Sequence, residues 1–227
     1  MKILKWVRNI FLILFGASIL AVVALKWIPV YFTPLMFERL YEQARDGKSL
    51  KLKHDWVSID KISKNMPQAV VASEDNLFLR HNGFDFKQIN VAVKDAQKGK
   101  RVRGASTISQ QTAKNVFLWQ GKSFIRKGME AYFTVLIEFV WGKKRIMEVY
   151  LNSIEMGDGI YGVEAVSQAN FNKSAKNLTR NEAARIAATL PNPLKFSSCN
   201  PSSYIKRRQE KIVWLMSRVD KVDFENK

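Results

Sequence analysis

The sequence has little cysteine, histidine, glycine or proline, and each shortage excludes a class of protein. One cysteine among 227 residues excludes an intramolecular disulfide. Together with only two histidines, it also excludes a zinc site built from cysteine and histidine ligands. The 11 glycines and 6 prolines are too few for a collagen-like or linker-dominated chain. We find no internal repeat and no low-complexity tract.

Acidic residues are also scarce, with 20 Asp and Glu against 37 Lys and Arg and a net charge of +17. This excess indicates an anionic partner: nucleic acid, an anionic membrane surface or a phosphorylated substrate. It is concentrated in residues 87–127, where ten basic residues accompany a single acid, Asp95. A solvated basic face and a phosphate-binding surface both fit this stretch. The 47% apolar and 25% charged residues are typical of a globular domain.

A long apolar run without charge occupies residues 10–25, and the charged residues that precede it are all basic. This pattern predicts a transmembrane helix with a cytoplasmic N-terminus and the rest of the chain outside. The alternative is a signal peptide cleaved near residues 22–24. Because the apolar run continues past that position, we expect a retained anchor. We therefore divide the chain into residues 1–37, a cytoplasmic stub, anchor and juxtamembrane segment, and residues 38–227, an extracytoplasmic domain.

The exported part has a mostly helical pattern. Apolar residues recur at three- and four-residue intervals over residues 125–140, which predicts a long amphipathic helix. Pro67 suits the first position of another helix. Strand signals are few, and residues 55–59 are the best candidate. Three segments have the pattern of an N-terminal capping box, namely residues 85–88, 107–110 and 179–182. We predict a compact, mainly α-helical domain.

Two adjacent acids, Glu74 and Asp75, follow an apolar helical stretch. A carboxyl group at the end of an apolar helix can acquire a raised pKa, which a general acid or base needs. A solvated helix end with a turn at Asn82 and Gly83 is the alternative interpretation.

Two further segments combine hydroxyl, amide and cationic side chains. Residues 103–115 form a small-residue loop before a capped helix, where N–H groups can hold an anion or sugar hydroxyls and Lys114 adds a positive charge. Arg126 and Glu130 are four residues apart on a predicted helix, so they form either a surface salt bridge or a second carboxylate beside cations. We assign helix packing and turns to residues 143–152, 157–163 and 178–193.

Together these segments resemble the peptidoglycan glycosyltransferases, glycosyltransferase family 51. The family pattern E-D-x-x-F-x-x-H-x-G-x-D is present without a gap at residues 74–85. The pattern G-G-S-T-I-T-Q-Q-x-x-K-N is present at residues 104–115, with Ala105 and Ser109 as departures. R-K-x-x-E and K-x-x-I-x-E-x-Y-L-N follow at residues 126–130 and 143–152. Four motifs in order are specific, and the resemblance covers roughly residues 50–201.

The resemblance implies a mainly α-helical, lysozyme-like fold of two lobes with an N-terminal transmembrane helix. It implies an enzyme that polymerises lipid II into β-1,4-linked glycan strands, releases undecaprenyl diphosphate and inverts the anomeric centre in a single displacement. Glu74 would be the general base, and Glu130 a second carboxylate that orients the donor diphosphate. The implied substrate-binding residues are Asp75, Ser106, Gln110, Lys114, Arg126 and Lys127. The implied cofactor is a divalent cation, Mg²⁺ or Mn²⁺, with no organic cofactor.

The same resemblance implies where the protein works and with what. The location is the plasma (inner) membrane, crossed once, with the catalytic domain on the outer, periplasmic side. Residues 31–37 would dip into the bilayer. The implied partners are lipid II, the growing glycan chain on undecaprenyl diphosphate, the membrane and a transpeptidase or other cell-wall synthesis proteins, with no nucleic acid. Because the sequence has no K-T-G motif, we expect no transpeptidase activity.

Two other functions remain open on the residues alone. A lytic, lysozyme-like glycosidase would use a pair of carboxylates to cleave glycan, without needing the Lys and Arg cluster. A membrane-tethered basic protein would bind nucleic acid or anionic lipid without catalysis. The products made from lipid II and from intact cell wall distinguish the three functions.

Overall fold

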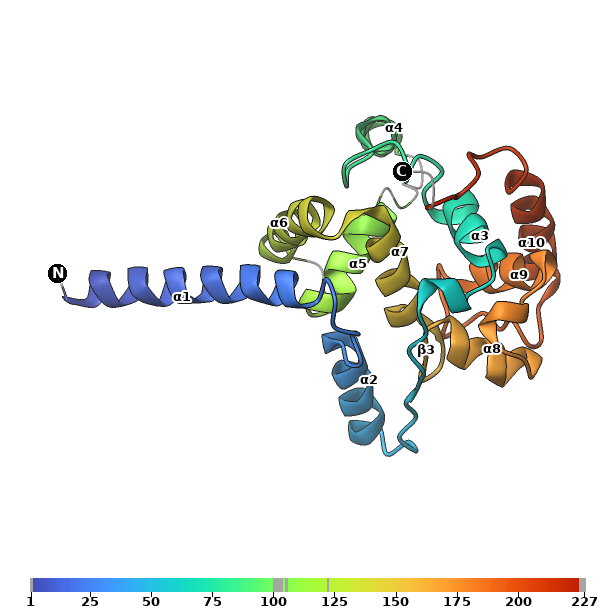
Figure 1. The fold of residues 1–227 in the computed structure, drawn as a ribbon, viewed down its shortest axis with the longest axis horizontal. Helices are drawn as coiled ribbons and strands as arrows, with labels where there is room; N and C mark the ends of the chain where they lie inside the picture. The colour runs from blue at the N-terminus through green and yellow to red at the C-terminus, as the bar shows by residue number, and fades with distance from the viewer. Residues whose placement is uncertain (1, 100–103, 105, 122, 225–227) are drawn as a thin grey trace.

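The computed structural model describes residues 2–99, 104, 106–121 and 123–224, and these residues form a mainly helical protein (Figure 1). A long N-terminal helix projects from a compact body. The prediction of a mainly α-helical chain with an N-terminal apolar helix is confirmed. Lys100, Arg101, Arg103, Ala105 and Lys122 of the basic stretch and its loop lie outside the described residues.

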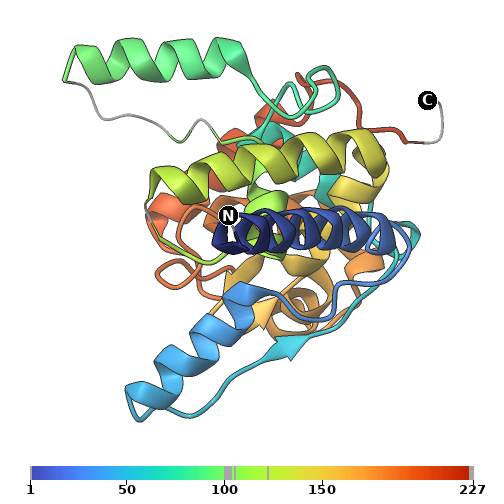
Figure 2. The same cartoon turned by 90° about the vertical axis from the view of Figure 1, so that its left-hand side faces the viewer.

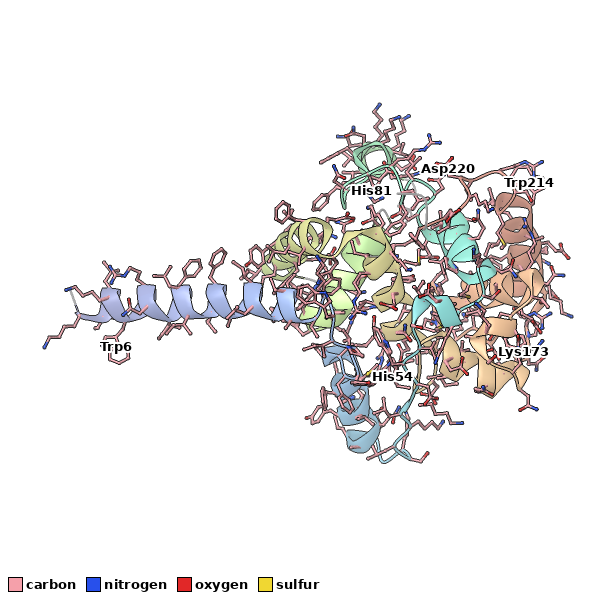
Figure 3. The ribbon with its side chains drawn as sticks, in the orientation of Figure 1. Trp6, His54, His81, Lys173, Trp214 and Asp220 are labelled. Atoms are coloured by element: carbon pink, nitrogen blue, oxygen red, sulfur yellow. The ribbon has the colours of Figure 1, made fainter. Side chains whose placement is uncertain are left out.

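The projecting helix, α1 (Lys2–Ala24), is longer than the apolar run that predicts it. Its 23 residues extend about 34 Å, enough to cross a bilayer core of about 30 Å. Its length and hydropathy make it a candidate membrane span, and only 6% of its most apolar 18-residue stretch is buried. Trp6 lies near the end of α1 farthest from the body (Figure 3). The exposure of these apolar side chains distinguishes α1 from the core helix of a soluble domain.

The last turns of α1 are bonded to the body. Trp141 Nε1 donates a 2.7 Å hydrogen bond to the carbonyl oxygen of Val22, which is itself buried. The Arg145 guanidinium donates to the carbonyl oxygens of Leu25 and Ile28, at 2.8 and 2.6 Å. The bond to Val22 satisfies a helix-end carbonyl, and the bonds to Leu25 and Ile28 satisfy carbonyls in the turn that follows α1. The end of α1 is therefore part of the folded domain.

The helices of the body pack as two groups. The first group consists of α3 (Asn65–Glu74), α9 (Arg180–Thr189) and α10 (Ser203–Leu215). The second consists of α5 (Ile108–Phe117), α6 (Phe124–Val140) and α7 (Gly142–Ser153), joined by α1 and α2 (Pro34–Arg45). The division at residues 37 and 38 falls inside α2. Helix α8 (Val163–Phe171) contacts α7 and the small sheet.

Helix α4 (Phe86–Gln97) differs from the other described α-helices because none of its residues is buried. It lies apart from the body, whereas α6 lies beside α1 (Figure 2). Phe86, Val91 and Val93 are among its exposed apolar side chains. Gly99, with φ +64°, follows its C-terminal end, a position where glycine is favoured.

The predicted helix starts are mostly confirmed. Thr107 with Gln110 and Thr179 with Glu182 form reciprocal capping boxes. Asp85 caps α4 in one direction only, by accepting from the backbone N–H of Gln88. The prediction that Pro67 opens its helix is wrong, because α3 begins at Asn65. Pro67 still lies in the first turn, where its missing N–H leaves no helical bond unmade.

The predicted strand at residues 55–59 is wrong. The strands are β1 (Lys53–His54), β2 (Glu155–Gly157) and β3 (Ile160–Tyr161), in the order β1-β3-β2, with β1 parallel and β2 antiparallel to β3. The N–H of Val57 donates to Asn152 Oδ1, and its carbonyl oxygen accepts from Asn152 Nδ2, both at 2.9 Å. These groups therefore pair with a side-chain amide and not with a neighbouring strand. Ile59 then begins a 3₁₀ turn (Ile59–Lys61), and a second 3₁₀ turn (Ala175–Asn177) follows α8.

Asn152 in the fourth motif is thus a packing residue, as the sequence favours. The backbone N–H of Ile59 donates to Glu148 of the same motif at 2.9 Å. Gly162 approaches the backbone of Asn152 so closely that an added Cβ would lie 2.6 Å from its carbonyl oxygen. Gly162 also has φ +81°, a conformation that L side chains rarely adopt.

We expect Gly162→Ala to destabilise the protein by about 3 kcal/mol, because it adds a backbone clash to an unfavourable conformation. Gly47→Ala is the matched control, with φ +66° and open space around the added Cβ, and we expect it to cost about 1 kcal/mol. Thermal unfolding in detergent, followed by circular dichroism, compares the two. Equal losses of Tm would contradict the importance of the Asn152 contact.

Candidate active site

Glu74 is the last residue of α3, at the point where this buried helix ends. The preceding residues Ala69, Val70, Val71 and Ala72 are buried in the core, so the helix end is fixed. The Glu74 side chain is only 14% exposed. Burial raises the pKa of the Glu74 carboxyl, and the negative charge of Asp75 adds to this effect; a hydrogen bond from Gln111 and the charge of Arg208 oppose it. The expected end-of-helix carboxyl with a raised pKa is present.

Three residues from three helices surround Glu74. Gln111 on α5 donates through Nε2 to Glu74 Oε2 at 3.4 Å. Tyr150 on α7 donates to Gln111 Oε1 at 3.3 Å, so it supports Glu74 through Gln111. Arg208 on α10 places Nη2 3.6 Å from Glu74 Oε1. Sequence reasoning missed all three. Gln111 and Tyr150 lie inside recognised motifs, but no pattern in the sequence singles out Arg208.

Asp75 makes a structural junction. It accepts the backbone N–H of Ile108, the first residue of α5, at 3.0 Å. Its other oxygen contacts His81 Nε2 at 2.9 Å. Because His81 Nδ1 accepts the N–H of Gly83, the ring proton belongs on Nε2 and is donated to Asp75. His81 lies below α4 in the view of Figure 3. Asp75 therefore joins the end of α3 to the start of α5.

Gln110 and Ser106 lie at the same helix start. Gln110 is buried, and its Oε1 accepts the backbone N–H of Thr107 at 3.0 Å. Ser106 is exposed, and it lines a cavity of about 240 Å³ together with Glu74, Asn76 and Gln88. Of the residues predicted to bind substrate, Ser106 thus has an accessible side chain, whereas Asp75 and Gln110 hold the backbone around it.

A buried carboxylate and cations occupy the first turns of α6. Glu130 is 2% exposed. Arg126 Nη1 donates to one of its oxygens at 2.8 Å, and the Lys127 ammonium contacts the other. The interpretation of Arg126 and Glu130 as a surface salt bridge is therefore wrong, because both side chains are largely buried. Arg126 Nε also donates to the carbonyl oxygen of Gly121 at 2.7 Å, which fixes the guanidinium.

Lys114 on α5 adds a third cation to this cluster. Burial lowers the pKa of the Lys114 ammonium; the charge of Glu130 opposes this, and the charges of Arg126 and Lys127 add to it. Among the described residues, Lys114 makes no ion pair within 4 Å. Three cations around one carboxylate leave an excess of positive charge, and such a cluster favours an anionic ligand.

Helix α5 connects the two carboxylates. Gln111 contacts Glu74, and Lys114, three residues later, interacts with Glu130. Residues three apart lie on the same face of a helix. Glu74 and the cationic cluster therefore interact with the same face of α5.

The described residues do not form a metal site. No three His, Cys, Asp or Glu side chains among them converge as ligands. Both oxygens of Glu130 are already occupied by cationic side chains.

The model of the transglycosylase family matches residues 42–217. This chain belongs to the transglycosylase family. It is 56% identical to the biosynthetic peptidoglycan transglycosylase of Bacteroides thetaiotaomicron over 97% of this chain and 89% of that protein. Proteins of the same name from Caulobacter vibrioides and Bdellovibrio bacteriovorus are 51% and 48% identical, over 89% and 92% of this chain and 86% and 84% of theirs. The predicted family is confirmed, and with it the lysozyme-like helical fold.

We expect Glu130→Gln to destabilise the protein by about 3 kcal/mol, because it leaves a buried guanidinium without its counter-charge. The matched control is Asp158→Asn, which removes one half of an ion pair with Lys51 whose side chains are both more than half exposed; we expect a loss below about 1 kcal/mol. Thermal unfolding of the two variants checks this. Equal stability of both variants would show that the cluster is not a buried ion-pair network.

Proposed function

We propose that the protein polymerises lipid II into β-1,4-linked glycan strands and releases undecaprenyl diphosphate. The observation that carries the proposal is the pairing of a buried carboxyl, Glu74, with an excess of cations across one face of α5. A base and an anion-binding cluster suit a reaction that removes a hydroxyl proton and expels a diphosphate. The relatives named above are peptidoglycan transglycosylases. The proposal includes no transpeptidase activity.

Glu74 is the general base of the proposed reaction. Its carboxylate takes the proton from the 4-hydroxyl of the acceptor GlcNAc as that oxygen attacks the anomeric carbon of the donor MurNAc. The bond to the diphosphate breaks on the opposite side, so the α-linked donor gives a β-linkage in one displacement. The raised pKa of Glu74 makes it a stronger base than an exposed glutamate.

The cationic cluster stabilises the leaving group. Lys114, Arg126 and Lys127 bind the donor diphosphate and offset the charge that develops on it. Glu130 holds Arg126 and Lys127 in place and so orients the diphosphate indirectly. In this proposal Ser106 contacts substrate, while Asp75 and Gln110 position the start of α5 on which Lys114 is carried. The use of a divalent cation, Mg²⁺ or Mn²⁺, as cofactor stays a prediction.

The structure suits a substrate that is embedded in a bilayer. Apolar side chains are exposed where α1 meets the body, including Tyr31, Phe32 and Phe37. On α6, which contacts α1, Phe124 and Phe139 are 96% and 90% exposed. Such residues favour insertion into the boundary between head groups and acyl chains. We place the protein in the plasma membrane, with the N-terminus in the cytoplasm and the domain on the outer side.

The proposal keeps α1 as a retained anchor. Cleavage near residues 22–24 would remove Val22 from the core and break its bond to Trp141. In the same proposal a transpeptidase or another cell-wall synthesis protein cross-links the strands. A lytic glycosidase needs no cationic cluster beside its carboxylates, and a mere binding protein needs no carboxyl with a raised pKa.

We expect Glu74→Gln to abolish polymerisation, with a loss of at least about 10³-fold, because it keeps the shape of the side chain and removes the base. Glu210→Gln, an exposed change on α10, is the control. Labelled lipid II is incubated with the detergent-solubilised full chain, with and without Mg²⁺, and the products are separated on gels. Near-normal activity of Glu74→Gln, with lipid II still bound, would refute the role of Glu74.

We expect Lys114→Met to weaken donor binding and also to lower turnover, with a loss of about 10²-fold in kcat/KM, because the cation neutralises the departing diphosphate. Lys206→Met, an exposed change on α10, is the matched control. Steady-state kinetics and a binding assay with a phosphoglycolipid inhibitor of the moenomycin type separate the two effects. A variant with unchanged kinetics and binding would exclude Lys114 from the site.

A further inference from the structure

Arg208 lies outside the four sequence motifs and reaches Glu74 from the C-terminal helix α10. Its Nη2 lies 3.6 Å from Glu74 Oε1, and the two side chains are 27% and 14% exposed. The packing of α10 against α3 and α9 holds the arginine at this distance. The C-terminal helix therefore contributes a charge to the candidate active site.

The contact between Arg208 and Glu74 acts through charge. A separation of 3.6 Å exceeds that of a hydrogen bond. Arg208 Nε is buried and has no hydrogen-bond partner among the described residues. An exposed arginine in this protein is bonded differently: Arg80 donates to both oxygens of Asp220, at 2.6 and 2.7 Å. Because a buried donor without a partner is costly, Arg208 has a poor bonding arrangement for a residue that only stabilises the fold.

The groups around Glu74 give Arg208 a specific role. Asp75 is negative and lies next in the chain, while Gln111 and the buried Tyr150 are neutral. Arg208 is the cation that contacts Glu74 among the described side chains. Without it, burial and Asp75 would both favour the protonated carboxyl, and the Gln111 hydrogen bond would be the remaining opposing influence.

We propose that Arg208 is a positioning residue that keeps Glu74 ionised, and so able to accept a proton, before each addition of a sugar unit. This inference rests on the proposed role of Glu74 as the base. The hydroxyl proton passes to Glu74 as the new glycosidic bond forms, and Glu74 then releases it to water. Arg208 favours this release, because its charge stabilises the carboxylate that is regenerated.

The test is the pH dependence of polymerisation by full-length Arg208→Gln. A base must be deprotonated, so the rate rises as pH increases through the pKa of Glu74. Loss of the cation raises that pKa. We expect the acidic limb of the profile to move up by about one pH unit, which is about a tenfold loss of rate at acidic pH, with recovery towards the wild-type rate at alkaline pH.

Two further variants serve as controls. Arg208→Lys keeps a charge at this position, and we expect its profile to lie close to that of the wild type. Arg207→Gln removes the same charge from an exposed neighbour on α10, and we expect no shift. A shift of equal size in Arg207→Gln, or a uniform loss of rate at every pH in Arg208→Gln, would overturn the proposal.

A second measurement does not depend on activity. Carbon-13 NMR titration of labelled glutamate carboxyls identifies Glu74 by the signal that Glu74→Gln lacks. We expect its titration to move upward in Arg208→Gln and to stay near the wild-type position in Arg208→Lys. This result would support the role of Arg208 even if lipid II were not polymerised. If Arg208→Gln fails to fold, a Glu74 titration in Arg208→Lys that moves upward by a full unit would overturn the proposal.

Discussion

The architecture of the site depends on one buried carboxylate, Asp75, which connects the two groups of helices. It follows directly on α3 and binds the first N–H of α5, while His81 holds its other oxygen. A carboxylate is favourable at a helix N-terminus, because it meets unpaired N–H groups and the positive end of the helix dipole. This contact fixes Glu74 relative to the helix that carries Gln111 and Lys114. It adds a direct polar link to the apolar core that α3 shares with α5 and α6.

The two ends of α5 face different electrostatic demands. Near its start, burial and a neighbouring acid favour a neutral carboxyl at Glu74. One turn further on, burial and neighbouring cations favour a neutral amine at Lys114. The protein meets these demands with opposite charges from other helices, Arg208 from α10 and Glu130 from α6. In each case the opposing charge comes from a residue that a distant part of the chain supplies.

Local sequence patterns predict the helices and the motif residues well, because caps and apolar periodicity act within a few residues. The boxes at Thr107 and Thr179 and the long helix α6 follow from such patterns. Contacts between distant segments are not encoded this way. The residues around Val57 have the pattern of a strand, but the Asn152 side chain binds the backbone N–H and carbonyl oxygen of Val57. In the sequence Arg208 is one of several basic residues on α10, and only the fold shows that it lies beside Glu74.

The bonds that Trp141 and Arg145 make to Val22, Leu25 and Ile28 attach the end of α1 directly to the body. In a bilayer, the helix and the enzyme then tilt as one unit. A membrane thinner or thicker than the hydrophobic length of α1 changes the tilt of that helix. The same tilt is transmitted to the face of α5 that carries the site. The angle between the site and the plane of the lipid head groups therefore depends on bilayer thickness.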